Sequence, residues 1–383
     1  MDIEELYKPI ILENIQIDGV CGESTRGGEN VEIIQSMFIS SLHREFDVFA
    51  KNILNPFLSY LSQKKINDIY VLIKEDGRAF VYEKFPFGFK VFTKKDVEAG
   101  TPVFKRDIFD VESVFFKNKY IDLNPKRNDK IIWIFRCDWN FGLYFNLTKD
   151  INESEILYDL GTYYKQVMYL NEYIFIEKSN YFKEMINDGW FPFIEIINNG
   201  FENIIKYYED KQKDQLLVEF LIESFSEKRM KDFTSKWWKN EIFNKKKDII
   251  EAGIESYLLN TKSGYINSIK NLLTELEGII RISFFKDFNK IPTTKDLKDY
   301  ISDSGKNRFT LARSLAFPDR FLDYLNEYIF KGFNLGNNDI PESRHSVAHG
   351  VATDVVYNRE FALKVILTMD NIFYFLNNKT LTR

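Results

Sequence analysis

Arg344, His345 and His349 lie close together near the end of the sequence and are the side chains best suited to chemistry. The chain of 383 residues has three histidines, so two of them share this short segment. Imidazole exchanges protons near neutral pH, and the planar guanidinium of arginine matches phosphate. These groups suffice to cleave RNA without a metal. Histidine would remove the 2′-OH proton and protonate the leaving 5′ oxygen, and arginine would neutralise charge on the phosphate.

This segment is expected to form a short helix over residues 342–349. Asn338, Asp339 and Pro341 are helix-start signals, because short polar side chains cap exposed amides and proline fits the first turn. Gly350 is placed to end the helix.

Helix geometry separates the three side chains. At about 100° per residue, His345 and His349 share a face, whereas Arg344 and His349 lie about 140° apart around the axis. One ideal helix therefore does not bring all three to a single atom. Two copies of the segment facing each other across a two-fold interface would do so, and the sequence thus predicts a homodimer through the C-terminal helices.

Glu277 is a second candidate, because it interrupts an apolar stripe. Leu273, Glu277, Ile280 and Phe284 share one face of a predicted helix. A carboxylate in such a stripe is costly unless it is paired, and Arg344 or a histidine is a suitable partner. Glu277 is therefore either a residue that orients the active groups or one half of a structural ion pair.

The segment from Arg344 to Gly350 resembles the signature of HEPN-domain ribonucleases. That signature is an arginine followed by a polar residue and, a few residues later, by a histidine. The region from Ala252 to Arg281, with Tyr257, Tyr265 and Ile269, is similar to the leading helices of some bacterial members. The amphipathic segment near the end of the chain is similar to the last helix of that family. The resemblance covers about the last third of the sequence.

This resemblance implies a metal-independent endoribonuclease without a cofactor, with its active site at a dimer interface and often a role in toxin or anti-phage defence systems. It implies that Arg344 and His349 are the catalytic pair and that His345 is the polar residue between them. The expected substrate is single-stranded RNA or an exposed tRNA loop, because a flexible backbone can align the 2′-OH with the phosphate.

Three other interpretations of the segment remain open. In the first, Arg344 and His345 cap a helix or pair with carboxylates, and His349 is a buried histidine. In the second, His345 and His349 bind zinc, although Ser346 stands where metalloprotease helices carry glutamate and the remaining histidine is His43. In the third, the domain is a catalytically silent HEPN-type binding or assembly module that senses a ligand or partner through its N-terminal region.

A locally basic stretch, residues 228–247, is a candidate RNA-binding surface. Basic groups interleaved with aromatics bind single-stranded nucleic acid by ion pairing and stacking, and Trp237 and Trp238 lie in this stretch. The alternative is a solvated helix face whose tryptophans point into the core. The lysines predicted to bind RNA are Lys236, Lys239, Lys245, Lys246 and Lys247.

The composition is that of a globular protein, with 44% hydrophobic and 28% charged residues. The net charge of −5 excludes a bulk polycation, so nucleic-acid binding needs a local basic surface. Two cysteines argue against a disulfide framework. No signal peptide or membrane span is expected, since Lys364, Asp370 and Asn371 interrupt even the apolar segment 363–376. We expect a cytoplasmic protein.

The first 150 residues are expected to form an α+β domain. Apolar periodicity predicts a helix over about residues 30–61. A β-hairpin follows, with strands at 69–73 and 79–82 and a turn at Asp76 and Gly77. Further strands are expected at 90–92, 131–136 and 141–145.

The rest of the chain is expected to be predominantly helical. Residues 151–245 form a middle region with breaks near 189–192 and Gly200, and residues 246–383 form the HEPN-like helical domain. Its helices are expected at 249–259, 265–285, 317–330 and 358–377. The region before it is expected to regulate the site and to receive an unknown activator or inhibitor.

Overall fold

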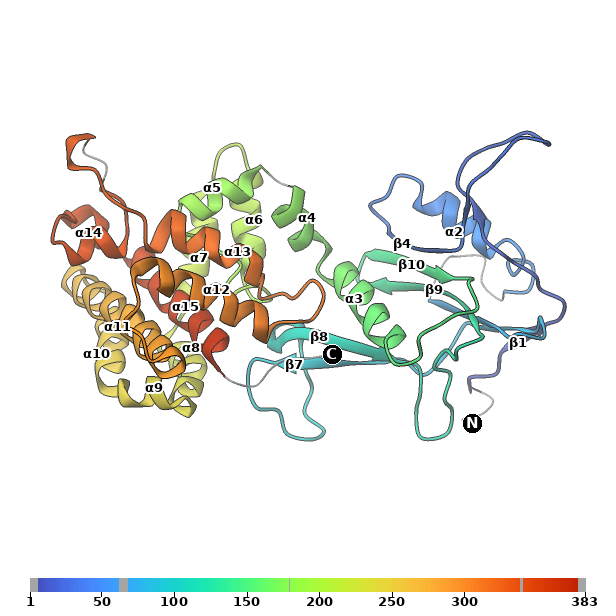
Figure 1. Cartoon of the computed structure of the whole chain (residues 1–383), viewed down its shortest axis with the longest axis horizontal. Coiled ribbons are helices and arrows are strands. Elements are labelled where there is room, and N and C mark those ends of the chain that lie inside the picture. The colour runs from blue at the N-terminus through green and yellow to red at the C-terminus, as the bar shows by residue number, and fades with distance from the viewer. Residues whose placement is uncertain (1–5, 62–67, 179, 338–339, 378–383) are drawn as a thin grey trace. The chain divides into compact units, whose positions relative to one another are not determined.

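The computed structural model describes residues 6–61, 68–178, 180–337 and 340–377 (Figure 1). The predicted cap residues Asn338 and Asp339 lie outside these ranges. The chain packs into two units, residues 1–91 with 111–170 and residues 92–110 with 171–383. The division at about residues 150 and 245 expected from the sequence stays a prediction.

Within the described residues, unit 1 is built on a six-stranded antiparallel sheet with the strand order β1-β6-β5-β9-β10-β4. The predicted hairpin is confirmed, because β5 pairs with β6 around the turn at Gly77. The strands expected at 131–136 and 141–145 are β9 and β10. In chain order the strands are β1 (Ile10–Leu12), β4 (Ser36–Ser40), β5 (Ile69–Ile73), β6 (Ala79–Tyr82), β9 (Lys130–Cys137) and β10 (Asn140–Asn146).

Both faces of this sheet are buried, since alternate residues of each strand point to opposite sides. Ile132 and Ile134 of β9 join a core with α2 (Phe46–Leu54). Trp133 and Phe135 join a second core with α3 (Ile156–Met168). Helix α3 approaches β8 (Ile108–Phe115) closely at Gly161, where a Cβ would lie 2.6 Å from the Cα of Ser113.

The helix predicted over residues 30–61 is wrong in its first half. Two strands, β3 (Ile33–Ile34) and β4, precede the shorter helix α2. Met37 and Ile39 of β4 pack on the α2 side of the sheet, and Phe38 packs on the α3 side. A short apolar run fits the period of a helix and that of a strand equally well. Here the pairing of β4 with β10 selects the strand.

Two small ribbons complete the β structure. Strand β2 (Val20–Cys21) pairs with β3, and β7 (Gly88–Thr93) lies beside β8 (Ile108–Phe115), which follows the 3-10 helix η1 (Lys105–Asp107). The strand expected at 90–92 is β7, whereas β8 was not predicted. The far end of this ribbon, residues 92–110, belongs to unit 2.

The remainder of unit 2 is helical, as predicted for the chain from Gln215 onward. The backbone breaks at Gly189–Pro192 and Gly200 are confirmed, and Gly200 has a positive φ of 120°. The early helices are α4 (Leu170–Lys178), α5 (Tyr181–Asn187), α6 (Phe201–Glu209), α7 (Gln215–Glu223), α8 (Glu227–Thr234), η2 (Ser235–Lys239) and α9 (Glu241–Lys245).

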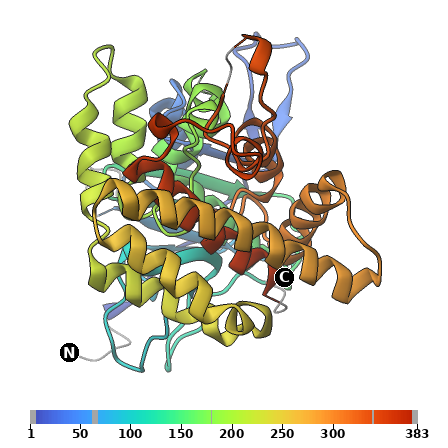
Figure 2. The ribbon, with the colours of Figure 1, turned by 90° about the vertical axis from the view of Figure 1, so that its left-hand side faces the viewer.

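The C-terminal helices surround α15, whose residues from Phe361 to Phe375 are all buried. Figure 2 shows α11 crossing α15, with α10 alongside α11. Helix α12 was not predicted, because its sequence is mostly polar and it begins at a capping box of Thr293 and Asp296. These elements are α10 (Lys247–Leu258), α11 (Lys262–Phe288), α12 (Thr294–Arg308), α13 (Pro318–Tyr324), the π-helix η3 (Leu325–Ile329), η4 (Leu335–Asn337), α14 (Arg344–Ala348), η5 (Asp354–Val356) and α15 (Arg359–Leu376).

The fold class expected from the sequence is thus confirmed: an antiparallel sheet region over residues 10–146 precedes an all-helical region. None of the helices in the described ranges combines the length and the apolar character needed to cross a membrane.

Candidate functional site

The segment with the two histidines forms the short helix α14, as the sequence predicted. Ser343 caps it by accepting a hydrogen bond from the backbone N–H of Ser346 at 3.3 Å. The Ser346 hydroxyl donates to the carbonyl of Pro341 at 2.6 Å. The helix ends at Ala348, His349 is its C-cap, and Gly350 adopts a left-handed φ of 70°. A capping box and a left-handed glycine therefore fix one turn of helix on both sides.

Glu342, which sequence reasoning missed, holds this helix against the rest of unit 2. Its carboxylate accepts hydrogen bonds from the Tyr328 hydroxyl at 2.5 Å and from the Asn358 amide at 2.6 Å. Tyr328 lies in the π-helix η3, and Asn358 caps α15 by accepting from the N–H of Phe361 at 2.7 Å. In the sequence, the sign of this role is a carboxylate placed immediately before the serine that caps the helix.

Glu277 of α11 is paired with Arg344, one of the partners that the sequence indicated. The carboxylate also accepts from the Nε of Arg281, one helical turn later, at 2.7 Å. Glu277 is 7% exposed, and the Arg344 side chain retains 25% of its accessible surface. The two guanidinium groups compensate the buried charge of Glu277, and the carboxylate in turn fixes the orientation of Arg344.

A cavity of about 390 Å³ adjoins this ion pair. A Cβ built on Gly278 would have no atom within 4 Å, so the α11 wall leaves open space there. The lining residues are Leu273, Thr274, Glu277, Gly278, Arg281, Arg344, Val347 and Ala348. A polyanion entering this space would meet the guanidinium groups of Arg281 and Arg344.

The two histidines lie together and are not among the residues that line the cavity. The rings of His345 and His349 are 6.2 Å apart between centroids and nearly parallel. Phe330 lies beside His345, at 6.3 Å, and Phe333 beside His349, at 5.7 Å. His349 is exposed. The structure therefore brings Arg344 to Glu277 and His345 to His349, in line with the separation around the helix axis expected from the sequence.

The electrostatic environment of His345 favours its neutral form. Partial burial lowers the pKa of His345 from its ordinary value, and electrostatic interactions with Arg344 and His349 lower it further. A neutral imidazole can accept a proton at neutral pH, as a general base must.

This environment predicts a measurable change in the titration of His345. In Arg344→Gln the pKa of His345 is expected to rise, because one neighbouring positive charge is removed while the carboxylate of Glu277 remains. Proton NMR of the imidazole rings measures this directly, and His345→Asn assigns the signal. Arg281→Gln serves as the control, since Arg281 binds the same carboxylate. A His345 pKa that stays constant in Arg344→Gln would contradict this account.

The five lysines predicted to bind RNA all form ion pairs within unit 2. Lys236 pairs with Asp370, Lys239 with Asp96, Lys245 with Glu241, Lys246 with Glu275 and Lys247 with Glu251. Trp237 is buried, and its indole N–H donates to Asp370 at 2.7 Å. The Lys236 side chain is only 14% exposed, and the role of all five lysines in RNA binding stays a prediction.

No three His, Cys, Asp or Glu side chains gather as metal ligands in the part of the chain that the structure describes.

Comparisons with protein-family models, with curated proteins and with solved structures find no match for this chain.

Proposed function

We propose that this protein is a metal-independent endoribonuclease. The 2′-oxygen of a nucleotide attacks the adjacent phosphorus, the bond from phosphorus to the 5′-oxygen breaks, and a cyclic phosphate and a 5′-hydroxyl result. His349, together with His345, removes the 2′-OH proton and protonates the 5′-oxygen, while Arg344 neutralises the charge on the phosphate. The observation that carries the proposal is Arg344, which the buried Glu277 fixes beside a cavity, five residues before His349.

Two copies of the chain complete the site in this proposal. Arg344 contacts Glu277 on the α11 side of α14, whereas His345 and His349 lie beside Phe330 and Phe333. A homodimer with facing α14 helices would place the arginine of one copy near the histidines of the other. The substrate is single-stranded RNA or a tRNA loop, and the setting is anti-phage defence or a toxin system in the cytoplasm. The N-terminal region would respond to an activator or inhibitor.

Incubation of the purified chain with total RNA in EDTA tests the proposal. We expect cleavage that leaves cyclic phosphate ends, and a loss of at least about a hundredfold in His349→Ala. Trp139→Phe is a suitable control, because Trp139 is 91% exposed in unit 1. Bound RNA that is never cleaved, with or without cell extract as a source of activator, would instead indicate a catalytically silent module.

The cavity at Gly278 gives an independent prediction. Because nothing lies within 4 Å of its Cβ position, a side chain added there projects into open space. Gly278→Ala is expected to keep activity and to gain up to about 1 kcal/mol of stability, since alanine replaces glycine inside a helix. Gly278→Trp is expected to fill the cavity and to reduce cleavage at least about tenfold at an unchanged melting temperature. Full activity in Gly278→Trp would exclude this cavity as the RNA entry.

A further inference from the structure

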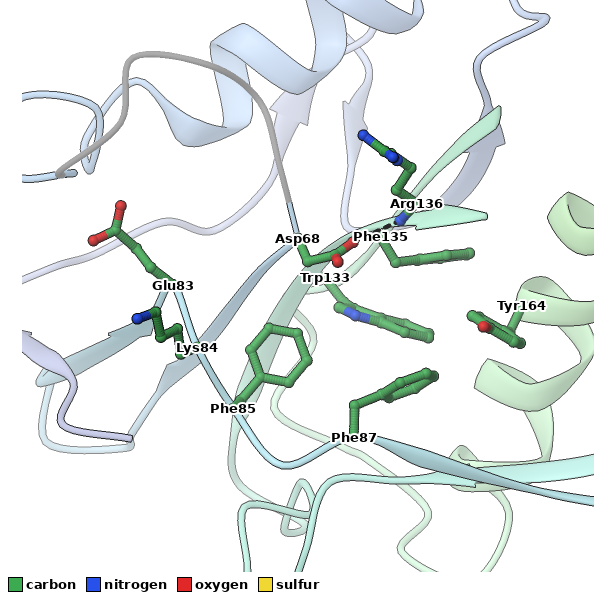
Figure 3. Close-up of a pocket in the computed structure, with 9 residues that line it drawn as sticks. All are labelled: Asp68, Glu83, Lys84, Phe85, Phe87, Trp133, Phe135, Arg136 and Tyr164. Carbon is green, nitrogen blue, oxygen red and sulfur yellow. Dashed lines mark hydrogen bonds between the residues drawn. The ribbon is translucent and has the colours of Figure 1, made fainter. Parts of the chain in front are cut away.

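Unit 1 contains a second cavity, of about 400 Å³, on the α3 side of its sheet (Figure 3). Five aromatic rings line it, contributed by the segment after β6, by β9 and by α3. They are those of Phe85, Phe87, Trp133, Phe135 and Tyr164. Trp133 and Phe135 face it together because they are two residues apart on one strand. Such a concentration of rings suits a flat, weakly polar ligand.

The indole N–H of Trp133 has no acceptor among the described residues. Trp133 is 1% exposed, so bulk solvent does not supply the missing acceptor. In Figure 3 the indole nitrogen lies on the side of the ring that faces Asp68 and Phe85. Buried polar groups are nearly always hydrogen-bonded, and an unmet donor beside a cavity therefore indicates a ligand that supplies an acceptor.

Asp68 supplies the complementary group. Its carboxylate accepts a hydrogen bond from the backbone N–H of Arg136 at 2.7 Å, which fixes it at the edge of the cavity. Partial burial raises the pKa of Asp68, although the N–H and the charge of Arg136 oppose that rise. A carboxylate with reduced hydration gains from a ligand N–H.

Basic side chains stand at the same cavity. Lys84 and Arg136 contribute to its lining, as does Glu83. In Figure 3 Arg136 points away from the aromatic rings. Lys84, which is exposed and lines the cavity, is the basic side chain suited to a phosphate attached to the ligand.

We propose that this cavity binds a nucleobase that carries a phosphate. The base stacks among the aromatic rings, accepts a hydrogen bond from Trp133 and donates one to Asp68, and its phosphate lies near Lys84. Each of the four RNA bases has an acceptor beside a donor on its pairing edge, so the class fits as a whole. An organic cation would also suit aromatic rings with a carboxylate, but it would leave the Trp133 N–H without an acceptor. The inference does not rest on the ribonuclease activity.

Isothermal titration of the full chain with AMP, GMP, CMP and UMP tests the proposal. At least one is expected to bind with a Kd below about 1 mM. Trp133→Phe keeps a ring but removes the N–H, and is expected to weaken binding about threefold to tenfold. Asp68→Asn, at the cavity edge, is expected to weaken nucleotide binding by a similar factor. It provides the test if Trp133→Phe does not fold. Trp139→Phe changes an exposed residue outside the lining, and as the control it is expected to bind normally.

Further ligands separate the sources and the alternatives. A short 2′-deoxy oligonucleotide, which cannot be cleaved through a 2′-OH, reports whether the base comes from a strand or from a free nucleotide, and Trp133-dependent binding of either supports the proposal. Four outcomes would overturn it: no nucleotide binds, inorganic phosphate binds as well as the nucleotides, choline binds in their place, or both Trp133→Phe and Asp68→Asn bind normally.

Discussion

Arg344→Ala is expected to reduce RNA cleavage by at least about a hundredfold without unfolding the protein. Removing one preorganised donor that stabilises transition-state charge typically costs about 10²–10³ in rate. Stability should change little, because the carboxylate of Glu277 keeps its hydrogen bond from Arg281 at 2.7 Å. Arg344 is itself partly exposed, so its removal leaves no large void. Rates in single-turnover assays and melting temperatures measure the two effects separately.

The matched variant is Arg281→Ala, which removes the other arginine from the same carboxylate. Arg281 also donates to the carbonyl of Pro292 at 2.9 Å, so its loss should lower stability more than that of Arg344 and should affect cleavage less. Arg344→Lys is expected to recover little activity, because an ammonium group does not reproduce the planar fork. If Arg344→Ala cleaved RNA at the normal rate, Arg344 would be merely one half of a structural ion pair.

The pair formed by Glu277 and Arg344 illustrates what the sequence made predictable. A carboxylate in an apolar stripe must find a partner, and the nearby cationic groups were few enough to name. The confirmed hairpin of β5 and β6 was predictable for a different reason, because its two strands are joined by a turn that the sequence specifies.

Other features that depend on distant parts of the chain left no such signal in the sequence. The cavity at Trp133 needs β9, α3 and the segment after β6 to come together, and no local pattern places them. The role of Glu342 depends on Tyr328 and Asn358, which belong to other elements. The wrong helix over residues 30–45 has a similar cause, because pairing of β4 with β10 overrode the local periodicity.

Asp370 shows how a residue that looks disruptive in the sequence becomes part of the core. It lies within the apolar stretch of α15 and is fully buried. Its carboxylate binds the Lys236 amine at 2.9 Å and accepts from the Trp237 indole at 2.7 Å. Lys236 also donates to the Tyr374 hydroxyl at 3.0 Å. These contacts join α15 to η2, and Lys236, 14% exposed at its side chain, depends on them.

Asp370→Ala is therefore expected to destabilise the protein by about 3–5 kcal/mol, because it leaves the buried ammonium of Lys236 unpaired. Glu241→Ala is the control: Glu241 also pairs with two lysines, Lys245 and Lys286, but its side chain is 60% exposed. That loss should be below about 1 kcal/mol. Urea unfolding followed by circular dichroism compares the two variants.

The double variant Lys236→Met with Asp370→Leu distinguishes the worth of the ion pair from the cost of breaking it. Apolar replacements of a buried ion pair are often neutral, so much of the stability lost in Asp370→Ala should return. The remaining loss should come from the Trp237 N–H, which has no acceptor once Asp370 is replaced.

The single variant Lys236→Met tests whether Lys236 binds RNA. If it weakened RNA binding while stability stayed normal, Lys236 would belong to the RNA surface. We expect it to lower stability and to leave RNA binding unchanged, because its amine contacts Asp370 and Tyr374 inside unit 2.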